Sequence, residues 1–181
     1  MIKPFQYCPM CATLMQLKSS EEDSHTREVC PSCGYVHYVN PLPVVGTVPV
    51  WGDKVLLCRR AIEPRKGYWT LPAGFMEIDE TLEGGAARET WEESGAHIEV
   101  KDLLTLISVP DAQPSQVHFY YVAELKDLDW NPGPETLEQR LFSEEEIPWD
   151  EISFTTVKTT LEHYFADRRL GRFSLHSYSL S

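Results

Sequence analysis

The stretch 74–96, GFMEIDETLEGGAARETWEESGA, decides the fold and holds seven carboxylates with a single arginine. Residues 81–94 contain few helix-breaking signals apart from Gly84 and Gly85, and Gly95 follows where a glycine cap ends a helix. Each internal glycine costs about 1 kcal/mol of helix propensity relative to alanine, so we expect close packing there against another backbone. The pattern predicts an acidic helix over residues 81–94.

One narrow stripe of this helix changes from apolar to acidic along its length. At about 100° per residue it holds Leu82, Ala86, Glu89 and Glu93, with Glu92 adjoining. A solvated charged face explains most acidic runs, but glutamates that continue an apolar stripe should face protein and need a counter-charge. Because carboxylate oxygens at i, i+3 and i+4 suit hard divalent cations, the pattern predicts a Mg²⁺ or Mn²⁺ site.

Four of the five cysteines form two Cys-x-x-Cys pairs separated by 18 residues: Cys8 with Cys11, and Cys30 with Cys33. This spacing is typical of zinc sites, and the hydrophilic segment between the pairs can form two short strands. Two disulfides are the alternative, but they require an oxidising compartment for which the sequence carries no export signal. We predict a four-cysteine Zn²⁺ ribbon over residues 1–40, with a structural ion.

The rest of the chain reads as strands with one further helix. Runs rich in β-branched and aromatic residues predict strands or strand-like segments at 44–51, 54–60, 68–75, 96–109, 116–125 and 138–149. Apolar residues recur at helical intervals over residues 155–169 and predict a second helix. This order of elements predicts an α+β fold, with a mixed sheet between helices, over residues 41–181.

Length and charge narrow the class of protein. The 181 residues fit one domain with a small accessory module. A net charge of −12 argues against nucleic acid as the partner, because such binding depends on neutralised phosphates. No apolar run is long enough to span a bilayer, and the N-terminus lacks the pattern of a signal peptide. We therefore expect no membrane partner and a cytoplasmic location.

The fixed positions of residues 74–96 resemble the Nudix box, G-x5-E-x7-R-E-U-x-E-E-x-G-U, in which U is a bulky apolar residue. Every polar and glycine position is filled, and the departures are Thr90 and Ala96 at U positions, which concern packing more than chemistry. The resemblance extends over roughly residues 43–170. Together with the cysteine pairs, the chain is similar to Nudix hydrolases with an N-terminal zinc ribbon, a subset that includes NADH, FAD and ADP-ribose pyrophosphatases.

This resemblance implies an α/β/α sandwich that hydrolyses a nucleoside diphosphate linked to a group X, giving a nucleoside monophosphate and phospho-X. Carried over position by position, it implies Mg²⁺ or Mn²⁺ ligation by Glu89, Glu92, Glu93 and a backbone carbonyl at Ala73 or Gly74. Arg88 would hold the box through ion pairs with Glu80 and a helix glutamate. Glu80 would then orient the arginine more than bind the metal.

The proton acceptor has three candidates. Glu135, in NPGPETLEQRLF, resembles a downstream glutamate that some pyrophosphatases use as a ligand or base. Glu138 is its rival, and Glu92 is the choice within the box if Glu135 fails. Four basic residues near the approach to the box could contact phosphates or be ordinary surface charge: Arg59, Arg60, Arg65 and Lys66. Aromatic residues such as Phe75 could stack a ring, although aromatic residues at strand spacing are more often core.

The resemblance leaves the substrate and the alternatives open. It implies a dinucleotide or nucleotide sugar, with FAD, NADH or ADP-ribose as the first choices, and a homodimer. A nucleotide sensor with a Nudix-like domain is an alternative of a different class, against which the intact set Glu89, Glu92 and Glu93 speaks. A nucleoside triphosphate pyrophosphohydrolase is the alternative within the enzymes.

Overall fold

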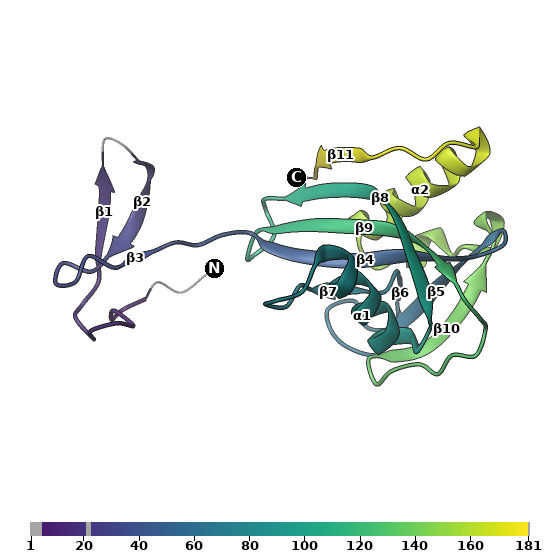
Figure 1. The fold of residues 1–181 in the computed structure, drawn as a ribbon, viewed down its shortest axis with the longest axis horizontal. Coiled ribbons are helices and arrows are strands. Elements are labelled where there is room, and N and C mark those ends of the chain that lie inside the picture. Colours follow the sequence, from purple (N-terminus) through teal and green to yellow (C-terminus); the bar gives the residue numbers. More distant parts are fainter. Residues whose placement is uncertain (1–4, 21–22, 181) are drawn as a thin grey trace.

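A computed structural model describes residues 5–20 and 23–180 of the chain. In Figure 1 a small sheet lies to one side of the main body and is joined to it by an extended segment. This sheet contains β1 (Gln16–Ser20), β2 (Asp23–Val29) and β3 (Val36–His37), all antiparallel. The pair of strands expected between the two cysteine pairs is therefore present.

The main body is built on a mixed sheet of eight strands. Its order is β10-β5-β4-β9-β8-β11, with β6 beside β5 and β7 beside β4. The strands are β4 (Leu42–Trp51), β5 (Lys54–Arg60), β6 (Trp69–Thr70), β7 (Ala73–Phe75), β8 (Ile98–Val109), β9 (Gln116–Leu125), β10 (Thr136–Phe142) and β11 (His176–Ser179). The β4–β9 and β8–β11 pairs are parallel and the other pairs are antiparallel, which confirms the predicted mixed sheet.

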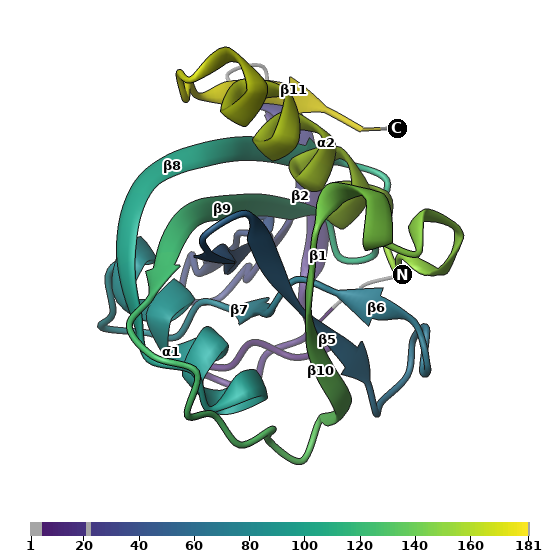
Figure 2. The same ribbon diagram turned by 90° about the vertical axis from the view of Figure 1, so that its right-hand side faces the viewer.

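Helices α1 (Leu82–Ser94) and α2 (Thr155–Leu170) cover opposite faces of this sheet (Figure 2). Alternate side chains of a strand point to opposite faces, so β4 contributes side chains to the packing against both helices. Its Val45 packs with Ala86 of α1, whereas its Val48 belongs to the main core with Leu161 and Phe165 of α2. The predicted sandwich is confirmed.

The acidic helix begins and ends where its capping residues predict. The Thr81 side chain accepts a hydrogen bond from the Gly84 backbone at 3.0 Å, and Gly95 adopts the left-handed conformation with φ of 69°. The packing expected around the internal glycines is partly wrong, because Gly84 is exposed. A β-carbon on Gly85 would lie 2.9 Å from the side chain of Val45, so this glycine makes room for side chains and not for another backbone.

Two other features differ from the expected elements. The strand predicted over 138–149 ends at Phe142, because Ser143 and Glu146 form a capping box that starts the 3-10 turn η1 (Glu144–Glu146). A second such turn, η2 (Trp149–Glu151), follows. Strand β11 was not predicted, since four residues give too short a pattern. Within residues 5–20 and 23–180, no helix is long and apolar enough to cross a membrane.

Candidate active site

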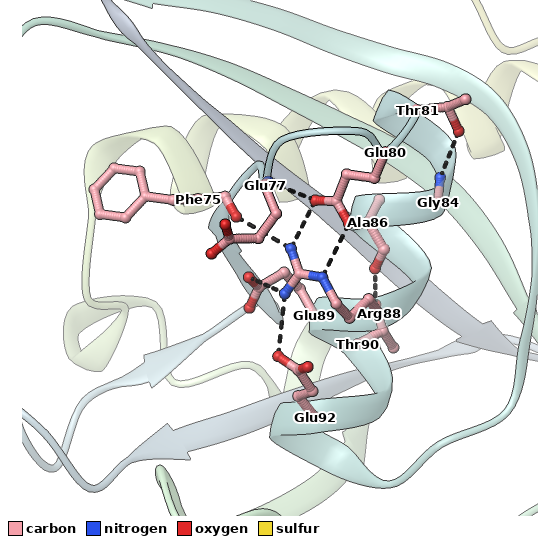
Figure 3. A network of polar contacts seen from close by, with 10 residues as sticks. All are labelled: Phe75, Glu77, Glu80, Thr81, Gly84, Ala86, Arg88, Glu89, Thr90 and Glu92. Atoms are coloured by element: carbon pink, nitrogen blue, oxygen red, sulfur yellow. Dashed lines mark hydrogen bonds and ion pairs between the residues drawn. The ribbon is translucent and has the colours of Figure 1, made fainter.

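Arg88 joins α1 to the loop that precedes it (Figure 3). Its Nε and Nη2 donate to both oxygens of Glu80, at 3.0 and 2.7 Å. Its Nη1 donates to Glu89 at 2.7 Å and to Glu92 at 3.1 Å, and its Nη2 also donates to the carbonyl oxygen of Phe75 at 3.1 Å. One guanidinium therefore fixes the loop and two box glutamates at once.

Glu80 is the charged partner that keeps this brace in place. The hydrogen bonds from Arg88, and then one from the Glu77 backbone at 2.7 Å, lower the pKa of Glu80 to about 2. The same pairing raises the pKa of Arg88. Both groups are therefore charged across the neutral range, and the brace does not depend on pH there.

Gly74 allows the loop to pass directly against the Glu89 carboxylate. A β-carbon at Gly74 would overlap the carboxylate atoms of Glu89. The Glu89 side chain is only 13% exposed, and burial raises its pKa although Arg88 opposes this effect. The loop and the arginine together hold this carboxylate in one orientation.

Gly74→Ala should displace Glu89 and lower kcat/KM by about a hundredfold, because a 1 Å misplacement of a catalytic group can cost that much. Gly84→Ala is the matched control, since its β-carbon would meet only the Thr81 hydroxyl, at 3.1 Å. The control should keep full activity and gain up to about 1 kcal/mol in free energy of unfolding. Steady-state kinetics with chemical denaturation would measure both; equal kinetics of the two variants would contradict the assigned role of Gly74.

Glu93 lies deeper than the other box glutamates, and one of its two carboxylate oxygens lacks a partner. Its Oε2 is buried with no hydrogen bond. Burial and then the neighbouring Glu89 raise the pKa of Glu93 to about 8, although Arg60 and the Ala73 backbone act in the opposite direction. A buried carboxylate oxygen without a partner is costly, so a cation beside this atom would stabilise the site.

A cavity of about 1020 Å³ opens beside these glutamates. Its lining includes Glu89, Glu92 and Glu93, together with Arg60 from β5. A loop before β10 forms another wall, where the Gly133 N–H donates to the Glu93 carbonyl oxygen at 3.0 Å. Strand β5 and this loop therefore bring residues to α1 that are distant from the box in sequence.

The structure separates the two downstream candidates for the base. Glu135 lines this cavity, at the end of the loop that contains Gly133. Glu138 does not line it and pairs instead with Arg59, at 3.5 Å. The two residues lie only three positions apart, but Glu135 precedes β10, whereas Glu138 lies within it, opposite Arg59 of β5.

The three box glutamates do not gather around one point. In the described part of the chain, the four cysteines alone form a group of three or more potential ligands whose donor atoms all lie within 4.8 Å. The Glu92 side chain is 49% exposed and is held by Arg88 at the rim. Glu89 and Glu93 are the inward-lying pair, and Glu92 would have to rotate to join them.

A second cavity, of about 610 Å³, adjoins the first. The two share Arg60 and the loop residues Ala73, Gly74 and Phe75. Alternate residues of β9, Gln116 and His118, line the second cavity and were not singled out in the sequence. Their signal was the period of two along a predicted strand, but that pattern does not say which face meets a cavity.

His118 should make the protein less stable in mild acid. Burial lowers the pKa of His118 to about 4, from an ordinary 6.5. As the pH falls from 7 to 5 the unfolded chain takes up a proton that the folded chain refuses, so stability should fall by about 1–2 kcal/mol. Denaturation of His118→Gln should show a correspondingly smaller loss, whereas the exposed His97→Gln should behave like the wild type. An unchanged pH dependence in His118→Gln would contradict this assignment.

The four predicted zinc ligands lie together at the end of the small sheet. The Sγ atoms of Cys8 and Cys33 are 3.6 Å apart, and those of Cys11 and Cys30 are 3.5 Å apart. Four sulfurs around one Zn²⁺, each at about 2.3 Å, would lie about 3.8 Å from one another. The separations exclude disulfides in this structure, in which all five cysteines are free. They fit a tetrahedral Zn²⁺ site.

The two cysteine turns have the same construction. Ala12 N–H donates to the Cys8 carbonyl oxygen at 2.9 Å, and Gly34 N–H donates to the Cys30 carbonyl oxygen at 3.0 Å. Both donors have positive φ, 58° and 77°. Each turn therefore presents its two thiolates from one side, as the Cys-x-x-Cys spacing predicts.

Known proteins resemble both parts of the chain. The NUDIX domain family matches residues 40–162, and the Nudix N-terminal family matches residues 6–39. A crystal structure of a NUDIX hydrolase from Nitrosomonas europaea is 46% identical, with a TM-score of 0.89, and the match covers 97% of this chain and all of that one. The chain therefore belongs to the Nudix family and carries the zinc-ribbon module found in part of it.

Curated relatives differ in name and in length. The NAD-capped RNA hydrolase NudC of Vibrio parahaemolyticus is 29% identical over 92% of this chain. The ADP-ribose pyrophosphatase of Methanocaldococcus jannaschii is 31% identical over 63% of this chain. This chain spans 62% and 69% of the lengths of these two relatives.

Proposed function

We propose that this protein hydrolyses the diphosphate bond of a nucleoside diphosphate linked to X, with Mg²⁺ or Mn²⁺, to give a nucleoside monophosphate and phospho-X. The observation that carries the proposal is the unpaired Oε2 of Glu93, buried beside Glu89 in an acidic cavity. A divalent cation supplies the missing counter-charge, and oxygen donors suit these ions. Arg60 at the same cavity offers a contact for substrate phosphate.

In this proposal the role of each residue is assigned from its surroundings. Glu89 and Glu93 would hold the cation with a backbone carbonyl at Ala73 or Gly74, and Glu92 would join after leaving Arg88. The bound cation would neutralise phosphate charge and lower the pKa of a water. Arg88, paired with Glu80, positions Glu89 and does not touch substrate in this proposal.

Glu135 is our proposed proton acceptor. It lines the cavity of the box glutamates, whereas Glu138 pairs with Arg59 outside it. A base must reach the attacking water, and a loop carboxylate at the cavity wall is placed to do so. Glu92 remains the alternative within the box.

The cavities and the relatives support a proposal for the substrate class. Two adjoining cavities suit a substrate with a group on each side of a diphosphate, so we propose FAD, NADH or ADP-ribose. The Vibrio relative is an NAD-capped RNA hydrolase, which weakens the expectation against nucleic acid that rests on the net charge of −12. A capped RNA end therefore belongs among the tested substrates.

We propose a cytoplasmic protein and a homodimer, the latter because Met10 of the first cysteine turn and Leu17 of β1 are more than 70% exposed. Sedimentation of the full chain would give one species of twice the monomer mass if the dimer exists.

Kinetics across a substrate panel would test the proposed function. We expect at least one of FAD, NADH, ADP-ribose and NAD-capped RNA to exceed every nucleoside triphosphate in kcat/KM by about tenfold or more, with Mg²⁺ or Mn²⁺ required. Preferred release of free pyrophosphate from a triphosphate would instead support a nucleoside triphosphate pyrophosphohydrolase. Binding without turnover would support the sensor.

A further inference from the structure

The junction between the two cavities limits how a substrate can lie. Arg60, Gly74 and Phe75 line both cavities, and only the larger one contains the box glutamates. If the diphosphate lies over the box, as the proposed function requires, one of its two substituents has the 610 Å³ cavity beside it. This cavity has the size of a ligand pocket, and Val44, Val109 and Phe154 supply apolar walls for a flat ring.

Three polar side chains of this cavity lie on one face of β9. Gln116, His118 and Tyr120 alternate along the strand, so their side chains share that face. The Tyr120 hydroxyl is buried and hydrogen-bonded to Thr156, so it is already engaged. On this face, Gln116 and His118 remain as the polar groups that can discriminate between ligands.

His118 fixes the direction in which the Gln116 amide points. The His118 Nε2 lies 2.8 Å from the Gln116 Oε1, and an amide oxygen can only accept, so Nε2 carries the hydrogen. Because burial keeps His118 neutral, its Nδ1 is then a bare acceptor, which agrees with the lack of any partner for that buried atom. The Gln116 amide then has the N–H groups of its own Nε2, and one lone pair of its Oε1, free to bind a ligand.

We propose that Gln116, oriented by His118, reads the ring that occupies the smaller cavity: a planar nitrogen heteroaromatic group with an N–H donor beside an acceptor. A glutamine amide matches such a pair with two parallel hydrogen bonds, as it does for adenine in nucleic acids. Gln116 is then a specificity-determining residue and His118 a positioning residue. The inference rests on the proposed function for the placement of the diphosphate.

Three groups of the proposed substrates share this chemistry. Adenine has an amino group beside a ring nitrogen, nicotinamide has a carboxamide, and the flavin ring has an imide N–H between carbonyl oxygens. The corresponding half-molecules, AMP, NMN and FMN, separate these sources. Only the one whose ring fills the smaller cavity should depend on Gln116.

Calorimetric titration of the full chain with AMP, NMN and FMN, without added Mg²⁺ or Mn²⁺, tests the inference. Gln116→Leu keeps the bulk of the side chain and removes both hydrogen bonds, so one of the three half-molecules should bind at least tenfold more weakly. The other two should change less than threefold. Gln16→Leu, which alters an exposed glutamine on the small sheet, should change none of them.

The positioning role of His118 requires a test whose expected result a purely structural role would not produce. His118→Phe should weaken the same half-molecule by about threefold, and His118→Gln should restore binding because its amide can still donate to Gln116. In the Gln116→Leu background, His118→Phe should have no further effect, since the amide that it orients is gone. Additive losses in the double variant would overturn the positioning role.

The possible results separate this inference from the proposed function. The inference would be overturned if Gln116→Leu bound each of the three half-molecules as tightly as the wild type does. It would also be overturned if the wild type bound none of them. Either result would hold even if the enzyme hydrolyses its substrate. A tenfold, ligand-specific loss would support it even if no diphosphate were ever cleaved. Turnover by the wild type is measured separately and reports on the proposed function alone.

Discussion

Glu93→Gln should lower kcat by at least about a thousandfold while the protein stays folded. Glu93 is the buried box carboxylate whose Oε2 has no partner, so it is the group that most needs a cation and that best holds one. Glutamine has the same shape but no charge, and it would leave the substrate phosphates without the full counter-charge. Steady-state kinetics with saturating Mg²⁺ or Mn²⁺ would measure the loss.

Stability separates this effect from a damaged fold. Burial raises the pKa of Glu93 to about 8 from an ordinary 4.5, so between these two values the folded chain keeps a proton that the unfolded chain releases, and stability falls as the pH rises. Without added divalent cations, Glu93→Gln should therefore be at least as stable as the wild type at pH 7. Glu83→Gln, an exposed glutamate of the same helix that lines neither cavity, should keep wild-type kinetics. An active Glu93→Gln enzyme would contradict the assignment of the box as the catalytic site.

Removal of zinc should unfold the small sheet and leave the main body folded. Among the side chains of residues 5–19 and 25–39, those that are buried are Cys8 and Cys30, at 3% and 1% exposed, whereas Met10 and Leu17 lie open to solvent. Such a module lacks an apolar core, and a structural zinc ion contributes about 10–16 kcal/mol of apparent binding free energy. Limited proteolysis after chelation should cut this region first.

Two cysteine variants provide the matched comparison. Cys33→Ala should lose the zinc that elemental analysis finds at one ion per wild-type chain, whereas Cys58→Ala, in the buried strand β5, should retain it. Turnover of Cys33→Ala should change by less than about tenfold, since the box lies in the main body, on α1 and the loop before it. Zinc retained in Cys33→Ala, together with protease resistance, would rule out the ribbon.

Local patterns in the sequence were sufficient to predict α1 and the cysteine cluster. Thr81 and Gly95 cap the helix through contacts within a few residues, and the Cys-x-x-Cys turns are equally local. The departure at Thr90 was correctly expected to concern packing. Its hydroxyl is fully buried but bonded to Thr47 of β4 at 2.6 Å, so the polar atom is satisfied.

The rest of the candidate site depends on contacts between distant segments. Arg60 reaches the cavity because β5 pairs with β4 and β10, and no local signal separated it from the neighbouring Arg59. Gln116 and His118 needed the register of β9 before one face could be assigned to a cavity. The spacing of the box alone does not show that Glu92 pairs with Arg88, because Arg88 and a bound cation compete for the same carboxylate.

Hydrolysis in H₂¹⁸O, followed by mass spectrometry of the products, tests the central claim most directly. With Mg²⁺ or Mn²⁺ and the preferred dinucleotide, we expect two phosphate monoesters, one of which carries a single ¹⁸O, and no free pyrophosphate. That pattern requires attack of water on the diphosphate bond. Recovery of the intact dinucleotide, under conditions where calorimetry shows it bound to the protein and its cations, would contradict the account.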